Sequence, residues 1–244
     1  MKLTDRIFLC GSGAFGLTPL GDCHCYVLNG GSELALIDCG LQKNPQAILD
    51  CMTADGLEVQ RLRWVLLTHT HPDHANGCAW LKENKDVCIA ASKFEAAALE
   101  HGLPEILNLT SVPDGYEQYA NIPRVRSDRI LQDGDRIRVG DLEVTALETP
   151  GHTAGSMCYQ IDTSTGRQLF SGDEVFYHGF VSVLTPPLSC YDQYPAGLGR
   201  LKNLHIDGLF PAHLMWTLQN GQSHIDKAIS AFEKDQRPVL KPFS

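Results

Sequence analysis

Three histidines and an aspartate lie within six consecutive positions of the segment Thr68 to Gly77, Thr-His-Thr-His-Pro-Asp-His-Ala-Asn-Gly. Neutral imidazole nitrogens bind zinc and other first-row metals, and a carboxylate adds negative charge. His69 and His71 are two residues apart, so in an extended loop they can converge on one ion. Asp73 and His74 can then face a second ion. This segment, called the metal loop below, is predicted to form half of a metal site.

The residues on either side of the metal loop predict how it is presented. The short, mainly apolar run Arg63 to Leu67 has the aromatic and β-branched residues that are typical of a buried strand. Residues 75–83 are good helix formers, and Pro72 prevents the cluster itself from lying inside an ordinary helix. We therefore expect the metal loop to leave the end of a strand and to lead into a helix.

Three strand ends in the second half of the chain each present one further candidate ligand. They are His152 in Thr-Pro-Gly-His-Thr, Asp173 in Ser-Gly-Asp and His213 after Pro-Ala. The strands predicted before them are residues 142–147, 167–170 and 208–210. A single histidine after a strand is commonly a hydrogen-bonded loop residue. Together with the metal loop, however, these positions give seven candidate ligands, enough for two ions that share a bridging group.

Asp38 stands at the end of another predicted strand, residues 33–38. An unpaired carboxylate is costly inside a protein, so a buried Asp38 needs a partner. It is either an acid of a surface loop or a group that orients a metal ligand.

The composition is that of an ordinary globular chain. It has 244 residues, 43% of them hydrophobic and 20% charged. No run approaches the roughly 18 apolar residues of a membrane span, and the formal net charge of −9 argues against nucleic-acid and anionic-membrane partners. The first residues lack the apolar core of a secretion signal, so a cytoplasmic location is expected.

The nine cysteines follow no regular framework, which suits reduced thiols in a reducing compartment. Cys23 and Cys25 would share one face of a strand predicted over residues 23–29. No second Cys-x-x-Cys pair completes four ligands, so buried thiols are expected here rather than a structural zinc site.

Strands and helices alternate in the first half of the chain, which predicts helices packed on a sheet. Further strands are predicted at residues 6–10, 87–91, 124–126 and 136–139, and helices at 44–56, 93–101 and 191–204. Residues 103–123 contain three prolines and interrupt this pattern, so they form either a binding loop or lid, or a plain surface excursion. The apolar stretch 180–190 either walls a pocket for an acyl chain or forms a buried connection.

The metal loop, followed in order by His152, Asp173 and His213, resembles the metallo-β-lactamase superfamily. The resemblance covers residues 38–213. It implies one domain over residues 1–244 with an α/β fold, a four-layer αββα sandwich of two mixed β-sheets flanked by helices.

The resemblance also implies how the ligands divide between two ions. The matching residues are His69, His71 and His152 for the first metal, Asp73, His74 and His213 for the second, and Asp173 as the bridge. Asp38 would orient a ligand from beside the site. Two divalent ions about 3.5–4 Å apart share a hydroxide that attacks the substrate, while one of them polarises its carbonyl or phosphoryl oxygen. Asp73 is also a candidate for passing a proton to the leaving group.

An aspartate as the bridge resembles the thioester hydrolases, lactonases and phosphodiesterases of the superfamily. True β-lactamases usually carry a cysteine or serine there. Hydroxyacylglutathione hydrolases share the metal motifs, but the Gly-Cys-Gly-Arg pattern that follows their bridging acid is absent here, which argues against glutathione recognition. Quorum-sensing lactonases place a tyrosine three residues after the bridge, where this chain has Phe176, with Tyr177 and His178 next. These three residues are candidates for a substrate pocket.

We therefore expect a dinuclear metal-dependent hydrolase that cleaves a carboxylic thioester, a lactone or a similar ester of a small molecule. Zinc is the expected metal, with iron and manganese as alternatives. Three other functions stay open: a mononuclear iron persulfide dioxygenase, a phosphodiesterase and a non-catalytic metal-binding protein. The sequence leaves the substrate and the oligomeric state open, a homodimer included.

Overall fold

The computed structural model describes residues 1–236 and Val239. Its backbone contacts divide the chain into two compact units. Unit 1 comprises residues 1–131 and 136–144, and unit 2 comprises residues 132–135 and 145–244. The single domain expected over residues 1–244 stays a prediction.

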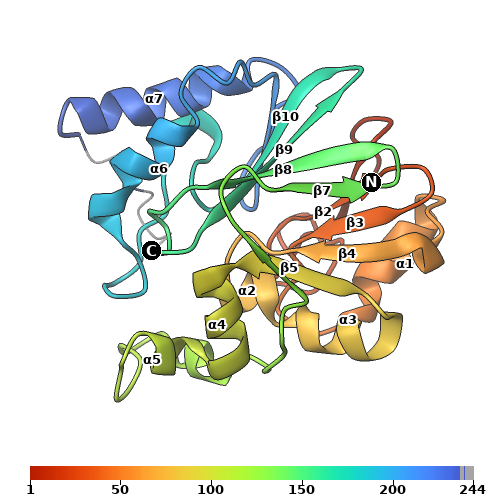
Figure 1. Ribbon diagram of the computed structural model, residues 1–244, viewed down its shortest axis with the longest axis horizontal. Helices are drawn as coiled ribbons and strands as arrows, with labels where there is room; N and C mark the ends of the chain where they lie inside the picture. The colour runs from red at the N-terminus through yellow and green to blue at the C-terminus, as the bar shows by residue number, and fades with distance from the viewer. Residues whose placement is uncertain (237–238, 240–244) are drawn as a thin grey trace. The chain divides into compact units, whose positions relative to one another are not determined.

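Unit 1 contains a six-stranded mixed sheet with the strand order β1-β2-β3-β4-β5-β6. Figure 1 labels β2 to β5 side by side in this order. Its strands are β1 (Ile7–Gly11), β2 (Cys25–Asn29), β3 (Leu34–Ile37), β4 (Leu62–Leu66), β5 (Cys88–Ser92) and β6 (Arg129–Leu131). The first three strands pair antiparallel, and β3 to β6 pair parallel. Every residue of β3 is buried, as expected for a central strand that is covered on both faces.

The helices of unit 1 lie mainly in the connections between these strands. They are α1 (Gln46–Ala54), α2 (Pro72–Ala75), α3 (Gly77–Lys85), α4 (Lys93–His101) and α5 (Leu103–Ile106), with short 3-10 helices η1 (Val59–Arg61) and η2 (Glu117–Asn121). Helix α1 packs on β1, and α3 and α4 pack on β5. The buried face of α1 consists of Ile48, Leu49 and Met52, which stabilise the packing by removing apolar surface from water.

A second, five-stranded mixed sheet has the order β11-β10-β9-β8-β7, and the boundary between the units falls within β8. Its strands are β7 (Arg136–Val139), β8 (Leu142–Glu148), β9 (Met157–Thr163), β10 (Gly166–Gly172) and β11 (Gly208–Pro211). In unit 2, β9 and β10 are antiparallel, whereas β10 and β11 are parallel. Parallel neighbours end at the same edge of a sheet, which matters for the residues that follow β10 and β11.

The helical segments of unit 2 are η3 (Tyr177–Gly179), η4 (Tyr191–Gln193), α6 (Tyr194–Arg200) and α7 (Gly221–Glu233). Helices α6 and α7 pack together, and α7 also packs on β11. The core of this unit joins Leu169 and Leu209 of the sheet with Leu198 of α6 and Ile225 of α7, all of them buried.

The predicted fold class is confirmed, because the chain forms two mixed β-sheets with flanking helices. The strand predicted at residues 124–126 is wrong, since the strand that pairs with β5 is β6, at Arg129–Leu131. Asp128 accepts a hydrogen bond from the backbone N–H of Ile89 and forms an ion pair with Lys82. These contacts set the start of the pairing with β5 at Arg129, after the predicted segment. Residues 103–123 are not wholly irregular, because they contain α5 and η2.

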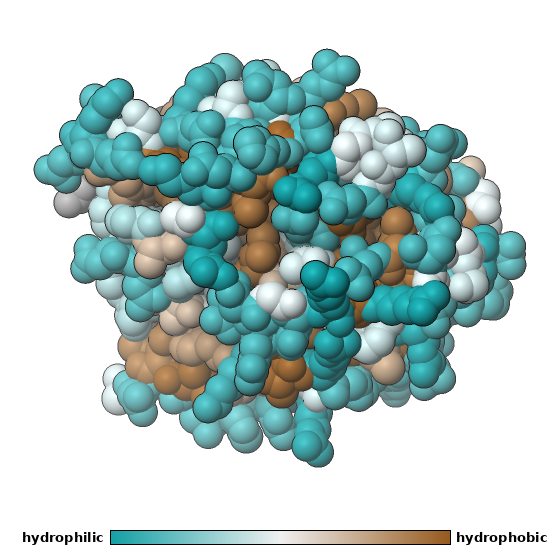
Figure 2. All heavy atoms as spheres, turned by 45° about the horizontal axis from the view of Figure 1, so that its top comes forward, coloured by the Kyte–Doolittle hydropathy of each residue, from teal (hydrophilic) through white to brown (hydrophobic). Residues whose placement is uncertain are grey.

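The surface agrees with the composition. The face drawn in Figure 2 is largely hydrophilic, with smaller hydrophobic areas between the polar side chains. Within the described part of the chain, no helix has both the length and the apolar character that crossing a membrane requires.

Gly30 permits a close approach of two turns in unit 1. Its N–H donates to the carbonyl of Glu33, and its own carbonyl accepts the N–H of Asp141. A Cβ atom at Gly30 would lie 1.8 Å from the carbonyl oxygen of Val139, so a side chain cannot fit without moving the backbone.

We predict that Gly30→Ala lowers the free energy of unfolding by about 1–3 kcal/mol through overpacking. Gly199→Ala is the matched control: Gly199 lies exposed in α6 and a Cβ atom there meets nothing within 4 Å. This control should leave stability unchanged or raise it by up to about 1 kcal/mol. Denaturant unfolding of both variants measures the difference, and equal effects would contradict the argument.

Candidate metal centre

The metal loop begins directly beyond β4. His71 is extended, with φ −69° and ψ 151°, and Pro72 starts the short helix α2. Proline suits the first position of a helix because its fixed φ is helical and its missing N–H is not needed there. Asp73 and His74 therefore lie in the first turn of α2, whereas His69 and His71 precede it.

The three imidazoles of the loop are buried and adjacent. The ring centre of His69 lies 4.5 Å from that of His71 and 3.9 Å from that of His74. The Nδ1 atom of His69 lies 3.0 Å from the Thr68 hydroxyl oxygen, and Nδ1 of His74 lies 2.9 Å from a carboxylate oxygen of Asp38. A histidine held in this way at Nδ1 presents Nε2 as its ligand atom.

Asp38 holds the start of the loop from the end of β3. Its Oδ1 accepts the backbone N–H of Thr68 at 2.8 Å, and its Oδ2 accepts the Thr68 hydroxyl at 2.8 Å and contacts His74. Asp38 is 1% exposed and has a left-handed φ of +56°, which aspartate tolerates better than most residues. The partners that a buried Asp38 needs are thus Thr68 and His74.

Glu95 of α4 supports the middle of the loop, a role that the sequence does not predict. Its Oε2 accepts both the N–H of Thr70 at 2.8 Å and the Thr70 hydroxyl at 2.6 Å. Ser92 caps α4 by accepting the N–H of Glu95. Ser-x-x-Glu at a helix start normally signals a capping box. Here the carboxylate serves the metal loop instead, which no local pattern reveals.

The segment 103–123 also reaches the loop. The Tyr119 ring, in η2, lies edge-on to the ring of His71 with 4.9 Å between ring centres, and Tyr119 is 8% exposed. Tyr116 packs against Tyr119 in turn. The segment therefore supplies aromatic packing to a candidate ligand, and its role as a lid stays a prediction.

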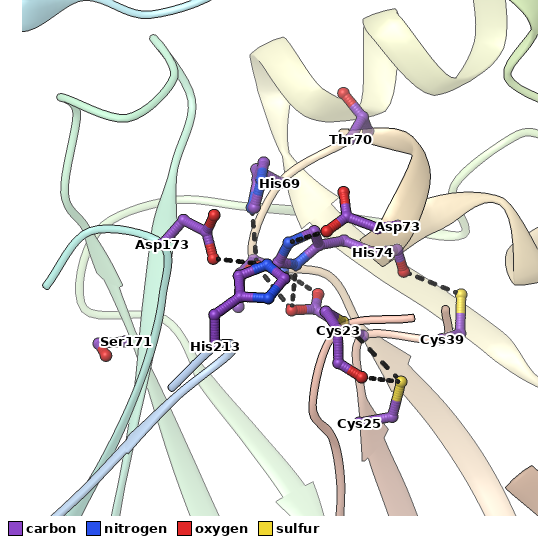
Figure 3. Close-up of polar contacts among 12 residues, drawn as sticks. Cys23, Cys25, Cys39, His69, Thr70, Asp73, His74, Ser171, Asp173 and His213 are labelled. Atoms are coloured by element: carbon purple, nitrogen blue, oxygen red, sulfur yellow. Dashed lines mark hydrogen bonds and ion pairs between the residues drawn. The ribbon is translucent and has the colours of Figure 1, made fainter. Parts of the chain in front are cut away.

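Asp73 and His74 have the spacing of two ligands of one ion. The Nε2 atom of His74 lies 3.4 Å from Oδ2 of Asp73 (Figure 3). Two ligand atoms at about 2.0–2.1 Å from a tetrahedral zinc ion lie roughly 3.3–3.4 Å from one another. The donor set of the loop, imidazole nitrogens with one carboxylate, therefore fits a divalent metal.

In unit 2, Asp173 lies between two histidines. Asp173 and His213 follow the parallel strands β10 and β11, in which Phe170 pairs with Phe210, so both leave the same sheet edge. One oxygen of Asp173 lies 3.5 Å from Nε2 of His213 (Figure 3). The other lies 3.6 Å from Nε2 of His152. These distances match the ligand spacing of a metal site, and each oxygen faces a different histidine.

The turn that carries His152 is held by two groups of unit 2. The Nδ1 atom of His152 lies 2.9 Å from the carbonyl oxygen of Ser182, and its backbone N–H donates to Oε2 of Glu174 at 3.3 Å. Glu174 is 1% exposed, and burial raises the pKa of its carboxyl well above the usual value, an effect that the His152 N–H opposes. Burial thus favours the neutral form of this side chain.

The three residues predicted for a substrate pocket point to different surroundings. Phe176 is buried, and its ring centre lies 6.2 Å from that of His213. The Tyr177 ring packs on His224 of α7, and the backbone N–H of His178 donates to Nδ1 of His224. The prediction that these residues line a pocket stays open.

The apolar stretch 180–190 is partly a buried connection. Val181 lies in the core of unit 2, and Leu188 is 2% exposed. Pro186 and Pro187, by contrast, are exposed.

Buried thiols lie beneath the metal loop. The Sγ atoms of Cys23 and Cys25 are 3.9 Å apart, and Cys39 donates from its thiol to the carbonyl of His74 (Figure 3). Ligand atoms of Cys23, Asp38 and His74 lie within 4.8 Å of one another. Burial, however, raises the pKa of the Cys23 thiol well above its usual value, which opposes the thiolate form that a metal would need.

The structure thus brings the sequence-predicted ligands together within each unit. The ligands in unit 1 are His69, His71, Asp73 and His74, and those in unit 2 are His152, Asp173 and His213. Their assignment as metal ligands stays a prediction, as does the assignment of each to a particular ion.

A family model described as the metallo-beta-lactamase superfamily matches residues 18–213, which is most of the chain. The chain therefore belongs to the metallo-β-lactamase superfamily, as the resemblance of its motifs predicts. Members of this superfamily are metal-dependent hydrolases.

Curated relatives include two thioesterases. The acyl-coenzyme A thioesterase MBLAC2 of Gallus gallus is 29% identical over 201 residues, 76% of this chain. The atrochrysone carboxyl ACP thioesterase of Aspergillus fumigatus is 25% identical over 239 residues, 98% of this chain. The lactamase-like protein vrtG of Penicillium aethiopicum is 27% identical over 87% of this chain. The chain spans 69%, 65% and 58% of the lengths of these three relatives.

Similar solved structures support the fold. BJP-1, a subclass B3 metallo-β-lactamase of Bradyrhizobium japonicum, has a TM-score of 0.76 and 22% identity over 96% of this chain and 91% of its own. A HARLDQ-motif mutant of a Cronobacter sakazakii metallo-β-lactamase has a TM-score of 0.74 and 20% identity over 96% of this chain and 95% of its own. At these identities the likeness concerns the fold alone.

We predict that Asp38→Asn weakens zinc binding by about 10–100-fold, the usual effect of removing a group that orients a metal ligand. An amide cannot accept from both the Thr68 hydroxyl and His74 while it also accepts the Thr68 N–H. Competition with a chromogenic chelator measures the affinity. Asp50→Asn removes the same charge from an exposed position on α1 and should have no effect; equal affinities in the two variants would refute the role of Asp38.

The environment of His224 leads us to predict that the stability of the fold depends on pH. Burial, with Lys227 and His178 nearby, lowers the pKa of His224 from its ordinary value of 6.5. At acidic pH the unfolded chain therefore binds more protons at His224 than the folded chain does. The contribution of neutral His224 to stability is fully present above pH 6.5 and is lost as the pH falls through 6.5 towards the folded pKa. Protonation at Nδ1 also removes the acceptor for the His178 N–H.

His224→Asn, which keeps an acceptor but does not titrate, should flatten the loss of unfolding free energy below pH 6.5. Chemical denaturation between pH 5 and 8, the range in which histidines titrate, measures this effect. His205→Asn is the control, because His205 is exposed and also has a positive φ, of 58°. A profile unchanged by His224→Asn would contradict the prediction.

Proposed function

We propose that this chain is a dinuclear, zinc-dependent thioester hydrolase. The observation that carries the proposal is the position of Asp173. Its two oxygens lie 3.5 and 3.6 Å from the Nε2 atoms of His213 and His152. A carboxylate that offers one oxygen to each of two histidine ligands is suited to bridge two ions.

The proposed ligand sets follow the superfamily pattern. The first ion would be held by His69, His71 and His152, the second by Asp73, His74 and His213, and both by Asp173. Two divalent ions supply a hydroxide nucleophile near neutral pH and polarise the substrate carbonyl. Within unit 1, Asp38 and Glu95 keep the metal loop in one conformation, so that the ligands need little reorganisation when metal binds.

Asp73 is the proposed group for proton transfer. Its side chain is 26% exposed, whereas the three histidines of the loop are at most 2% exposed, so it is the member of the loop that can meet a leaving group. In the reaction, the oxygen of water adds to the acyl carbon and the carbon–sulfur bond breaks. The proton from water passes through Asp73 to the thiolate, and the products are a carboxylic acid and a thiol.

Thioesters are the proposed substrate class because two curated relatives carry thioesterase in their names. An aspartate at position 173 fits this class but does not distinguish it, since lactonases and phosphodiesterases of the superfamily share that residue. Lactones and simple oxygen esters present the same carbonyl to the site and are the competing substrates in the test.

The first experiment measures metal content and turnover together. Protein purified without added metal should contain two zinc ions per chain, and Asp73→Ala should reduce the content towards one. A panel of acyl-coenzyme A thioesters, lactones and phosphodiesters should give turnover with thioesters foremost. Asp173→Ala should reduce this turnover by at least about 10²–10³-fold, the scale lost when one electrostatic stabiliser is removed.

Asp192→Ala makes the same change at an exposed residue of η4 and should leave turnover intact. Full activity in Asp173→Ala would refute the bridging role. A single iron that is unaffected by Asp73→Ala would instead favour the persulfide dioxygenase. Two bound ions with phosphodiester turnover, or with no turnover, would favour a phosphodiesterase or a metal-binding protein.

A further inference from the structure

One main-chain carbonyl in unit 2 accepts two side-chain hydrogen bonds. The carbonyl oxygen of Ser182 lies 2.9 Å from Nδ1 of His152, and it also accepts the hydroxyl of Tyr194. A carbonyl oxygen can only accept, so the proton of the His152 ring must reside on Nδ1. In the neutral imidazole, which is the form that binds a metal, Nε2 is then the lone-pair nitrogen, the one that faces Asp173.

Ser182 lies in the stretch 180–190, which has no long regular element of its own. The stretch is tied back to the His152 turn at its far end, where the N–H of Cys190 donates to the carbonyl of Gly151 at 2.9 Å. Inside it, the N–H of Leu184 donates to the Ser189 hydroxyl. The direction of the Ser182 carbonyl therefore depends on a few contacts, and the Tyr194 hydroxyl is one of them.

Tyr194 is placed to serve both sides of this arrangement. It begins α6 and is fully buried, and a Cβ atom on Gly151 would lie 2.7 Å from its ring. The ring thus packs directly on the turn that carries His152. Burial, with Glu174 and Asp173 nearby, raises the pKa of Tyr194 well above its usual value, so its hydroxyl stays protonated and continues to donate.

We propose that Tyr194 is a positioning residue for His152, acting through the Ser182 carbonyl. The Tyr194 hydroxyl fixes the acceptor, the acceptor fixes the tautomer and orientation of the imidazole, and the imidazole presents Nε2 beside Asp173. An acceptor held on its second side rotates less, which keeps Nε2 on target. The inference concerns the metal site of the proposed function and rests on His152 being a ligand.

The stretch 180–190 is exposed at Pro186 and Pro187, while Ser182 near its start contacts a candidate ligand. A displacement of the stretch would be transmitted to the His152 ring through one hydrogen bond.

The test is Tyr194→Phe, which removes only the hydroxyl and keeps the ring that packs on Gly151 and on Phe232. Zinc affinity, measured with a chelator series, should fall by about 10–100-fold for one of the two ions. The unfolding midpoint of the metal-free protein should change little. Tyr191→Phe is the matched control, since Tyr191 also packs against Phe232 and lies three residues before Tyr194; it should bind both ions as the wild type does.

A second measurement needs no metal and no turnover. In metal-free wild-type protein, the Nδ1 proton of His152 should give a slowly exchanging, downfield resonance, which Tyr194→Phe should move upfield or broaden. Absence of that proton from the wild type would overturn the proposal without any variant. Unchanged zinc affinity in Tyr194→Phe would overturn it as well.

The outcomes separate this proposal from the proposed function. Weakened zinc binding in Tyr194→Phe, combined with no thioester turnover by the wild type, would support the positioning role and reject the thioesterase. Thioester turnover by the wild type, with zinc binding unaffected in Tyr194→Phe, would do the reverse.

Discussion

The hydrogen bonds of the buried Asp38 carboxylate are the interaction on which the metal loop of unit 1 depends. Strands β3 and β4 run parallel with Ile37 paired to Leu66, so the residues that follow them leave the sheet side by side. Asp38 directly follows β3, and Thr68 lies just beyond the end of β4, where its N–H donates to Asp38. A buried charge is costly unless it is hydrogen-bonded, and three contacts from Thr68 and His74 meet that need. The same contacts leave the loop little freedom, which suits it to hold a metal.

The sequence predicts those features of the fold and the site that have local signals. Buried apolar runs mark β3 and β4, and the ligand types stand directly after strands, so the fold class and the segments that carry the site can be inferred. Residues Arg124 to Arg126 alternate like a strand, yet the anchor at Asp128 decides where pairing with β5 begins. Pairing of that kind depends on a distant segment and leaves no local mark.

The supporting residues of the site are hidden from sequence for the same reason. Glu95 has the position of an ordinary helix-start acid, and Ser182 contributes only its main chain, which carries no side-chain signal. Likewise, the motifs show that Asp173 and His213 each follow a strand. Only the parallel pairing of β10 with β11 explains why residues 40 positions apart meet at 3.5 Å.

The hydrogen bonds between the Glu95 carboxylate of α4 and Thr70 have an evolutionary consequence. The Glu95 carboxylate accepts one hydrogen bond from the main chain of residue 70 and one from the Thr70 hydroxyl. A change of Glu95 therefore removes both bonds from a buried place, whereas a change of Thr70 removes only the hydroxyl bond and leaves the N–H as a donor. Selection should therefore keep an acceptor at position 95 even in homologues that have lost the threonine, while the neighbouring surface of α4 drifts freely.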